Sequence, residues 1–168
     1  YLGDDDALLP DCLEASRRLI DALKMEVICW ARSHVYWWPN AIVPWHRNRM
    51  YLTLSNNAWI VDSNDFLRGL YDHFDFRMLP MIYAGVVHRD LIKRAEDIRG
   101  TYFPVPNADI SSGVINAALT EKFFFSDRPF CLAGNSANSI GTSGCYSSKA
   151  RKTVKTFLDE HTDTQRKY

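Results

Sequence analysis

No stretch of this sequence stays apolar for the ~20 residues that a bilayer-spanning helix needs, so no membrane span is expected. Charge of neither sign is in surplus: 20 Lys and Arg residues balance 20 Asp and Glu residues, so the formal net charge is zero. Proteins that neutralise nucleic-acid phosphates need a basic surplus or a basic stripe. The one dense basic run, residues 149–155, is typical of a solvated helix face, so no nucleic-acid partner is expected.

Cysteine is scarce, and its spacing is irregular. The chain has four cysteines, Cys12, Cys29, Cys131 and Cys145, and no C-x-x-C motif joins any two of them. Zinc sites and disulfide frameworks depend on characteristic cysteine spacings, so neither is expected here. A reducing location, the cytoplasm, is the simpler expectation.

The apolar content is sufficient for one core. Of the 168 residues, 46% are hydrophobic and 24% are charged, which is a globular balance in a chain of single-domain size. Apolar periodicity predicts helices over residues 10–25, 64–74, 89–97 and 110–120, and a terminal helix around Val154, Phe157 and Leu158. Short strands are expected at residues 27–31, 50–54, 81–87 and 130–133, and irregular segments at 32–48, 101–107 and 134–144. Short strands that alternate with helices indicate an α/β domain.

Three consecutive acids, Asp4, Asp5 and Asp6, follow the apolar pair Tyr1-Leu2 and Gly3. Adjacent carboxylates repel one another unless a cation lies between them, and hard oxygen ligands suit Mg²⁺ or Mn²⁺ shared with a substrate phosphate. The alternative is an acidic loop that leads into a helix N-terminus, where negative charge is favourable. Because the chain opens on what looks like the end of a buried strand, we expect it to be part of a longer protein.

The run from Leu2 to Pro10 resembles the Asp-x-Asp segment of family 2 glycosyltransferases, which have the GT-A fold. With Pro10 as the anchor, the family's metal-binding Asp falls on Asp5, and Asp6 follows it as a further metal candidate. Gly3 stands where the family usually has its first Asp, which leaves open whether Asp4 takes over that contact with the donor.

A second stretch, residues 100–113, resembles the family's G-x-Y-F…P-D-V-Y-S-G run. The matching residues are Gly100, Tyr102, Phe103, Asp109, Ser112 and Gly113, whereas Ala108 stands where Pro is common. The resemblance implies that Asp109 is the general base, the group that removes a proton from the acceptor hydroxyl. Asp109 is equally well placed as the N-cap of a helix over 110–120, and both roles can hold at once.

A third stretch, residues 134–144, resembles the family's G-x-S-x-x-S-x-G-x-S loop, with Ile140 where Asn is frequent. Backbone N–H groups and small hydroxyls in such a loop can surround a diphosphate or a sugar. The resemblance implies substrate contacts from five residues: Gly134, Ser136, Ser139, Gly141 and Ser143. The three motifs occur in the family's order and span residues 2–144.

Aromatic and basic residues supply further candidates. Five large aromatics, Trp30, Tyr36, Trp37, Trp38 and Trp45, crowd one stretch, where they serve either as core and interface anchors or as a platform for a sugar ring. Trp37 is our candidate for the platform. His88 and Arg89 match a strand-to-helix position of the family and are candidate phosphate or acceptor contacts, with a structural histidine at a helix start as the alternative.

Taken together, the resemblance implies part of a GT-A fold, a mixed sheet flanked by helices, with the nucleotide-binding half lying before residue 1. It implies metal-dependent, inverting transfer of a sugar from a nucleotide-sugar to an acceptor hydroxyl. The acceptor would be a glycan or lipid-linked glycan of a bacterial surface. The expected cofactor is Mn²⁺ or Mg²⁺, and the expected location is the cytoplasm, including the inner face of the membrane.

Two other functions stay open. In a non-catalytic interaction or assembly module, the acids would only cap helices and the aromatics would form a protein interface. A Mg²⁺-dependent phosphohydrolase would use the acidic triplet together with a partnering Lys, and no such Lys motif lies near Asp4, Asp5 and Asp6.

Overall fold

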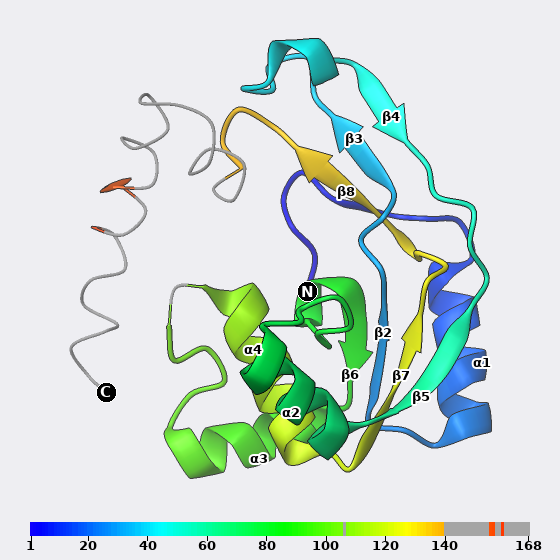
Figure 1. Ribbon diagram of the computed structural model, residues 1–168, viewed down its shortest axis with the longest axis vertical. Helices are drawn as coiled ribbons and strands as arrows, with labels where there is room; N and C mark the ends of the chain where they lie inside the picture. The colour runs from blue at the N-terminus through cyan, green and yellow to red at the C-terminus, as the bar shows by residue number, and fades with distance from the viewer. Residues whose placement is uncertain (106, 140–154, 157–158, 160–168) are drawn as a thin grey trace.

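The computed structural model describes residues 1–105, 107–139, 155–156 and 159. In this part of the chain, two four-stranded sheets and four α-helices form an α/β fold, with the sheets one above the other along the long axis (Figure 1). Several expectations fall outside the described residues: Gly141, Ser143, Cys145, and the residues Val154, Phe157 and Leu158 of the expected terminal helix. Of the basic run at residues 149–155, only Lys155 is described. Cys12, Cys29 and Cys131 are free and buried.

The lower sheet in Figure 1 has the strand order β5-β7-β2-β6. It comprises β2 (Val27–Trp30), β5 (Ala58–Asp62), β6 (Gly85–Val87) and β7 (Lys122–Ser126). The central pair β2 and β7 is parallel, and both outer pairs are antiparallel. The upper sheet has the order β1-β8-β3-β4, from β1 (Ala7–Leu8), β3 (Val35–Trp37), β4 (Arg49–Tyr51) and β8 (Cys131–Asn135).

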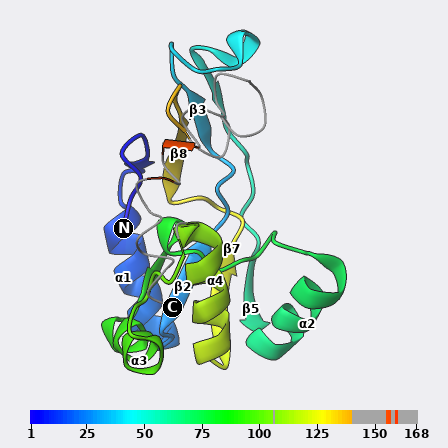
Figure 2. The same ribbon diagram turned by 90° about the vertical axis from the view of Figure 1, so that its left-hand side faces the viewer.

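Helices cover both faces of the lower sheet. Alternation along β2 sends Val27 and Cys29 to one face and Trp30 to the other. The first face packs against α2 (Ser63–His73), α3 (Arg89–Arg99) and α4 (Ala108–Leu119), and the second against α1 (Cys12–Leu23). Figure 2 shows α1 and α2 on opposite sides of the sheet.

Two segments of the chain run from the lower sheet into the upper sheet. One passes from β2 into β3 and the other from β7 into β8. β2 pairs with β7 and β3 pairs with β8, both in parallel, so the two segments leave the lower sheet at the same level, at residues 31–34 and 127–130. Two hydrogen bonds join the two segments, from Ala31 N to Ser126 O at 2.8 Å and from Ala133 N to His34 O at 2.8 Å. The carboxyl ends of two parallel strands therefore meet at the boundary between the sheets.

Several expectations from the sequence need correction. The expected mixed sheet is present as two mixed sheets. The expectation that residues 32–48 are irregular is wrong, because they contain β3, which belongs to the second sheet, and a 3₁₀ turn, Pro44–His46. β5 and β7 were not expected, and the expected strand 81–87 is half 3₁₀ helix (Ile82–Ala84) and half β6. The helices expected at 10–25, 64–74, 89–97 and 110–120 are confirmed as α1 to α4, with ends shifted by a few residues.

Candidate functional site

The acidic turn lies against the end of β8. Gly3 and Asp6 close the turn through a hydrogen bond from Asp6 N to Gly3 O, and β1 then pairs with β8 with Ala7 opposite Leu132. Continuing this register places the turn beside the last residues of β8. Gly134 is required there, because a Cβ at this position would lie 1.9 Å from the backbone oxygen of Asp5.

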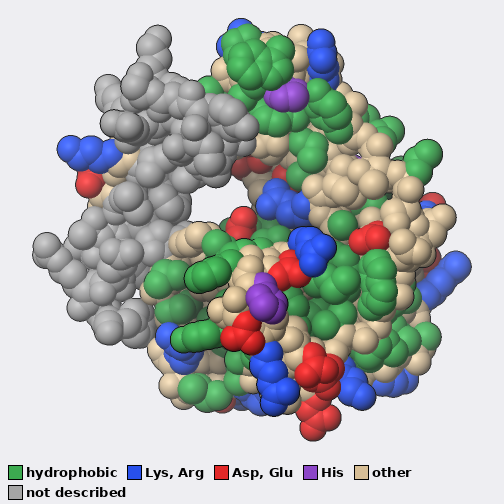
Figure 3. Space-filling view, in the orientation of Figure 1, with side chains coloured by type: hydrophobic (Ala, Val, Ile, Leu, Met, Phe, Trp, Pro, Cys, Tyr) green, Lys and Arg blue, Asp and Glu red, His purple; other side chains and the backbone are tan. Residues whose placement is uncertain are grey.

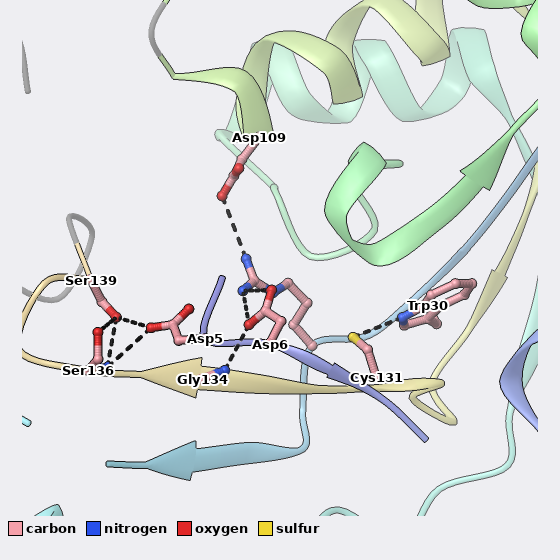
Figure 4. Close-up of polar contacts among 9 residues, drawn as sticks. Asp5, Asp6, Trp30, Asp109, Cys131, Gly134, Ser136 and Ser139 are labelled. Atoms are coloured by element: carbon pink, nitrogen blue, oxygen red, sulfur yellow. Dashed lines mark hydrogen bonds and ion pairs between the residues drawn. The ribbon is translucent and has the colours of Figure 1, made fainter. Parts of the chain in front are cut away.

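Asp5 is held by the segment that follows β8. Its Oδ2 accepts a 2.7 Å hydrogen bond from Ser139 Oγ and a 3.3 Å hydrogen bond from the backbone N–H of Ser136 (Figure 4). None of the hydrogen bonds found among the described residues uses its Oδ1. Asp5 is partly exposed and Asp4 is exposed, so the turn presents carboxylate oxygens to solvent.

Asp6 points inward instead. Its side chain is only 2% exposed, its Oδ1 accepts a 2.8 Å hydrogen bond from Gly134 N, and both of its oxygens accept from Arg32 Nη2 at 3.3 to 3.4 Å. A buried carboxylate requires such partners, because the charge loses its hydration. In this structure Asp6 therefore ties the acidic turn to β8 and to the segment after β2.

Arg32 lies at the boundary between the two sheets, two residues beyond the end of β2. It joins Asp6 to Asp109, since Nη1 lies 3.6 Å from Asp109 Oδ2 while Nη2 contacts Asp6 (Figure 4). Its Nε is buried and makes no hydrogen bond with any described residue. Acidic and basic side chains lie next to one another near the middle of the face in Figure 3, at the level where the sheets meet.

Asp109 lies in the first turn of α4, and buried polar contacts fix this helix. Ser112 Oγ accepts from Ile82 N, Asn116 Nδ2 donates to Pro80 O at 2.7 Å, and Tyr102 Oη donates to Asn116 Oδ1 at 2.7 Å. The expectation that Asp109 is the N-cap is wrong: the N-cap is Asn107, and Asp109 is the second residue of the helix. Its carboxylate is therefore free to face Arg32.

The surroundings of Asp109 make its carboxylate a stronger proton acceptor than an exposed aspartate. Burial raises the pKa of this carboxyl above its ordinary value; the neighbouring charge of Arg32 lowers the pKa, and that of Asp6 raises it. A carboxylate with a raised pKa is a stronger base than an exposed one. Tyr83 belongs to the same environment: its own pKa is raised by burial first and by the charge of Asp109 next.

The structure does not bring all the predicted residues together. His88 is the N-cap of α3, where its Nδ1 accepts from Asp90 N, and its backbone N donates to Glu26 O just before β2 begins. His88 and Arg89 therefore lie at the opposite end of β2 from Arg32. Trp37 is paired with Asn135 of β8 and stacks on His46 with ring centroids 4.6 Å apart, near the Ser136 side of the site.

Sequence reasoning missed Arg32 and Tyr83. A signal for Arg32 was present, because it follows directly on the buried run from Val27 to Ala31, and residues at the carboxyl ends of strands in open α/β sheets commonly face a ligand site. Tyr83 had no comparable signal, since it lies in a 3₁₀ turn that the sequence pattern assigns to a strand.

The oxygen-rich turn is chemically suited to a divalent cation. Asp5 and Asp4 offer hard oxygen ligands of the kind that Mg²⁺ and Mn²⁺ prefer, while Asp6 is engaged with Arg32 and Gly134. Among the described residues, no three His, Cys, Asp or Glu side chains gather into one metal-binding group.

Searches against models of protein families and against curated proteins found no match to the chain. None of the helices in the described part of the chain has the length and hydropathy that crossing a bilayer requires. The function is therefore inferred from the site.

Proposed function

We propose that this chain is the catalytic and acceptor-side part of a family 2 glycosyltransferase with the GT-A fold. It would transfer a sugar from a nucleotide-sugar to a hydroxyl of a glycan or lipid-linked glycan, with inversion at the anomeric carbon, in the cytoplasm. One observation supports this above all: the acidic turn, the Gly134–Ser139 segment and Asp109 come from distant parts of the chain, and contacts of Asp5, Asp6 and Arg32 join them.

Asp109 is the proposed base. As the acceptor oxygen attacks the anomeric carbon, its proton passes to Asp109, a new C–O bond forms, and the bond from that carbon to the diphosphate oxygen breaks on the opposite face. Burial raises the pKa of Asp109, which strengthens it as a base, while Arg32 keeps the charged form accessible.

The acidic turn is the proposed donor side. Asp5, with Asp4 beside it, would hold Mn²⁺ or Mg²⁺, which when bound supplies positive charge for the departing diphosphate. Ser136 and Ser139 orient Asp5 through its Oδ2, so its Oδ1 stays directed away from these two donors. Asp6 acts as a positioning residue, because it fixes Gly134 and Arg32 from within the protein.

A thermal unfolding experiment tests the donor side. The intact protein, including its nucleotide-binding half, is titrated with UDP-, GDP- and dTDP-sugars, with and without Mn²⁺. We expect one nucleotide-sugar to raise the unfolding temperature only when Mn²⁺ is present, since a ligand that binds the native state stabilises it. Asp5→Asn should remove this increase.

The matched control is Asp11→Asn, which changes an exposed acid of the same segment at a left-handed backbone position that Asn tolerates. It should respond as the unchanged protein does. No response to any nucleotide-sugar, or an equal response in Asp5→Asn, would contradict the proposal and favour the non-catalytic module.

A further inference from the structure

A cavity of about 510 Å³ lies between α2 and the β5–β7 strand pair, beside the candidate site. This volume falls in the range of roughly 300–1,000 Å³ that is usual for small-molecule sites. Ala31 and Asp127, which follow β2 and β7, line it, so it reaches the carboxyl ends of the two parallel strands. Ala31 directly precedes Arg32, and α2 lies beside β5 in Figure 2.

The floor of the cavity is aromatic. Trp59 of β5 and Phe125 of β7 are register partners, their ring centroids are 6.1 Å apart, and Phe66 of α2 lines the same space. Trp59 is 38% exposed although it lies in a strand. Aromatic faces of this kind provide a flat apolar surface for a ring with axial C–H groups.

The rim is polar and carries both acceptors and donors. Arg77 Nη2 donates to Asp75 Oδ2 at 2.6 Å, and Arg77 Nε donates to Asp75 Oδ1 at 2.9 Å. Asp127 Oδ2 accepts from Ser55 Oγ at 3.2 Å and from Asn57 Nδ2 at 3.4 Å. Each ligand hydroxyl can donate to a carboxylate and accept from a guanidinium or an amide, so such a rim suits a polyhydroxyl compound.

The charge of the rim argues against a phosphate. The cavity is lined by Asp65, Asp75 and Asp127 and by one basic residue, Arg77. The hydrogen bonds from Arg77 lower the pKa of Asp75 to about 2, so this carboxylate remains charged at neutral pH. Three carboxylates against one guanidinium repel an anion, and a neutral ligand avoids this repulsion.

Gly69 keeps one wall of the cavity open. It lies in the interior of α2, where Gly is less favourable than Ala by about 1 kcal/mol. No close neighbour excludes a side chain, because a Cβ at this position would meet nothing within 4 Å, and its backbone is not left-handed. The space that Gly69 leaves is cavity space.

We propose that this cavity binds a neutral sugar ring, with the apolar face of the ring against Trp59 and its hydroxyls along the edge formed by Asp75, Arg77 and Asp127. As a subsite for the acceptor glycan it rests on the proposed function, whereas sugar binding itself needs neither donor nor metal ion. The two can therefore be tested separately.

Saturation-transfer NMR tests the cavity directly. The probes are the methyl glycosides of glucose, galactose, mannose and N-acetylglucosamine, added without nucleotide or metal ion. We expect transfer to at least one of them. Gly69→Leu, which fills the cavity, and Trp59→Ala, which removes its floor, should each weaken binding by roughly tenfold or more, a change of about 1.4 kcal/mol.

Trp45→Ala is the matched control, because Trp45 is 65% exposed and does not line the cavity. It should leave the transfer unchanged, and thermal unfolding should show that each variant is folded. If Gly69→Leu does not fold, the comparison of glycoside binding by Trp59→Ala with that by Trp45→Ala tests the proposal.

The inference is overturned if none of the glycosides binds, if Trp59→Ala binds as the unchanged protein does, or if uridine binds in the cavity in place of the glycosides. Sugar binding without nucleotide-sugar turnover would leave this inference standing and contradict only the proposed transfer.

Discussion

Arg32 Nη1 lies 3.6 Å from Asp109 Oδ2, although the two residues are 77 positions apart in the chain. The same guanidinium contacts Asp6, so one cation joins an acidic turn at one end of the sequence to the first turn of α4. This arrangement keeps two carboxylates close together despite their repulsion. It also makes Arg32 the residue on which the geometry of the site depends most.

Replacement of Arg32 should destabilise the protein. In Arg32→Gln, the carboxylate of Asp6, which is 2% exposed, loses its charged partner, and a buried charge left in this way costs about 2 kcal/mol or more. Urea denaturation measures the change in the free energy of unfolding. Arg17→Gln is the control, since the Arg17–Asp21 pair is well exposed and such pairs contribute roughly 0–1 kcal/mol. Equal effects of the two substitutions would show that Arg32 does not stabilise the turn.

Gly134→Ala should also be strongly destabilising. The added Cβ would lie 1.9 Å from the carbonyl oxygen of Asp5, so the acidic turn must move away from β8, at a cost of roughly 1–3 kcal/mol. Gly69→Ala is the matched control, because its Cβ meets nothing within 4 Å and Ala favours the helix. Thermal unfolding of both variants checks this. A Gly134→Ala protein as stable as Gly69→Ala would mean that the turn does not pack on β8 as described.

Asp109→Asn should be as stable as the unchanged protein at pH 7, or more stable. Burial raises the folded-state pKa of Asp109 above its ordinary value of 3.8. The protonated group therefore favours folding below the unfolded-state pKa, and this contribution is lost as the pH rises through the folded-state pKa. Asn resembles the protonated form of Asp at every pH. The stability of Asp109→Asn should therefore approach that of the unchanged protein as the pH falls below about 4, where Asp109 is protonated in both the folded and the unfolded state. Unfolding temperatures at pH 7 and at low pH measure this, and a large loss of stability at pH 7 would assign Asp109 a structural role instead.

The helices could be predicted from the sequence because their apolar spacing is regular. α3 also ends at Gly100, the residue type most common at a left-handed cap. α1 ends in the same conformation at Lys24, where the residue type gives no such signal. The strands were harder, because their identity depends on partners far away in the chain. β3 lies in an aromatic stretch between breakers and becomes a strand through pairing with β4 and β8, and β5 is stabilised by its long register with β7.

The site could be predicted in part. Local motifs indicated Asp5, Asp109, Ser136 and Ser139, which the structure places around Arg32 and the end of β8. They could not indicate that Asp6 turns inward, since its burial depends on Arg32 and Gly134. Ser112 matches a family motif, and its hydroxyl accepts from Ile82 N and donates to the carbonyl of Asp109, so in this structure it fixes α4.

Turnover in the intact protein tests the central claim most directly, through the release of nucleoside diphosphate from the nucleotide-sugar that stabilises the protein in the presence of Mn²⁺. With acceptor glycan present, Asp109→Asn should abolish this release, a loss of at least about 10²-fold for a missing base, while the donor still raises the unfolding temperature. Asp5→Asn should lose both the release and the stabilisation by the donor. Full release in Asp109→Asn, or in Asp5→Asn, would contradict the account.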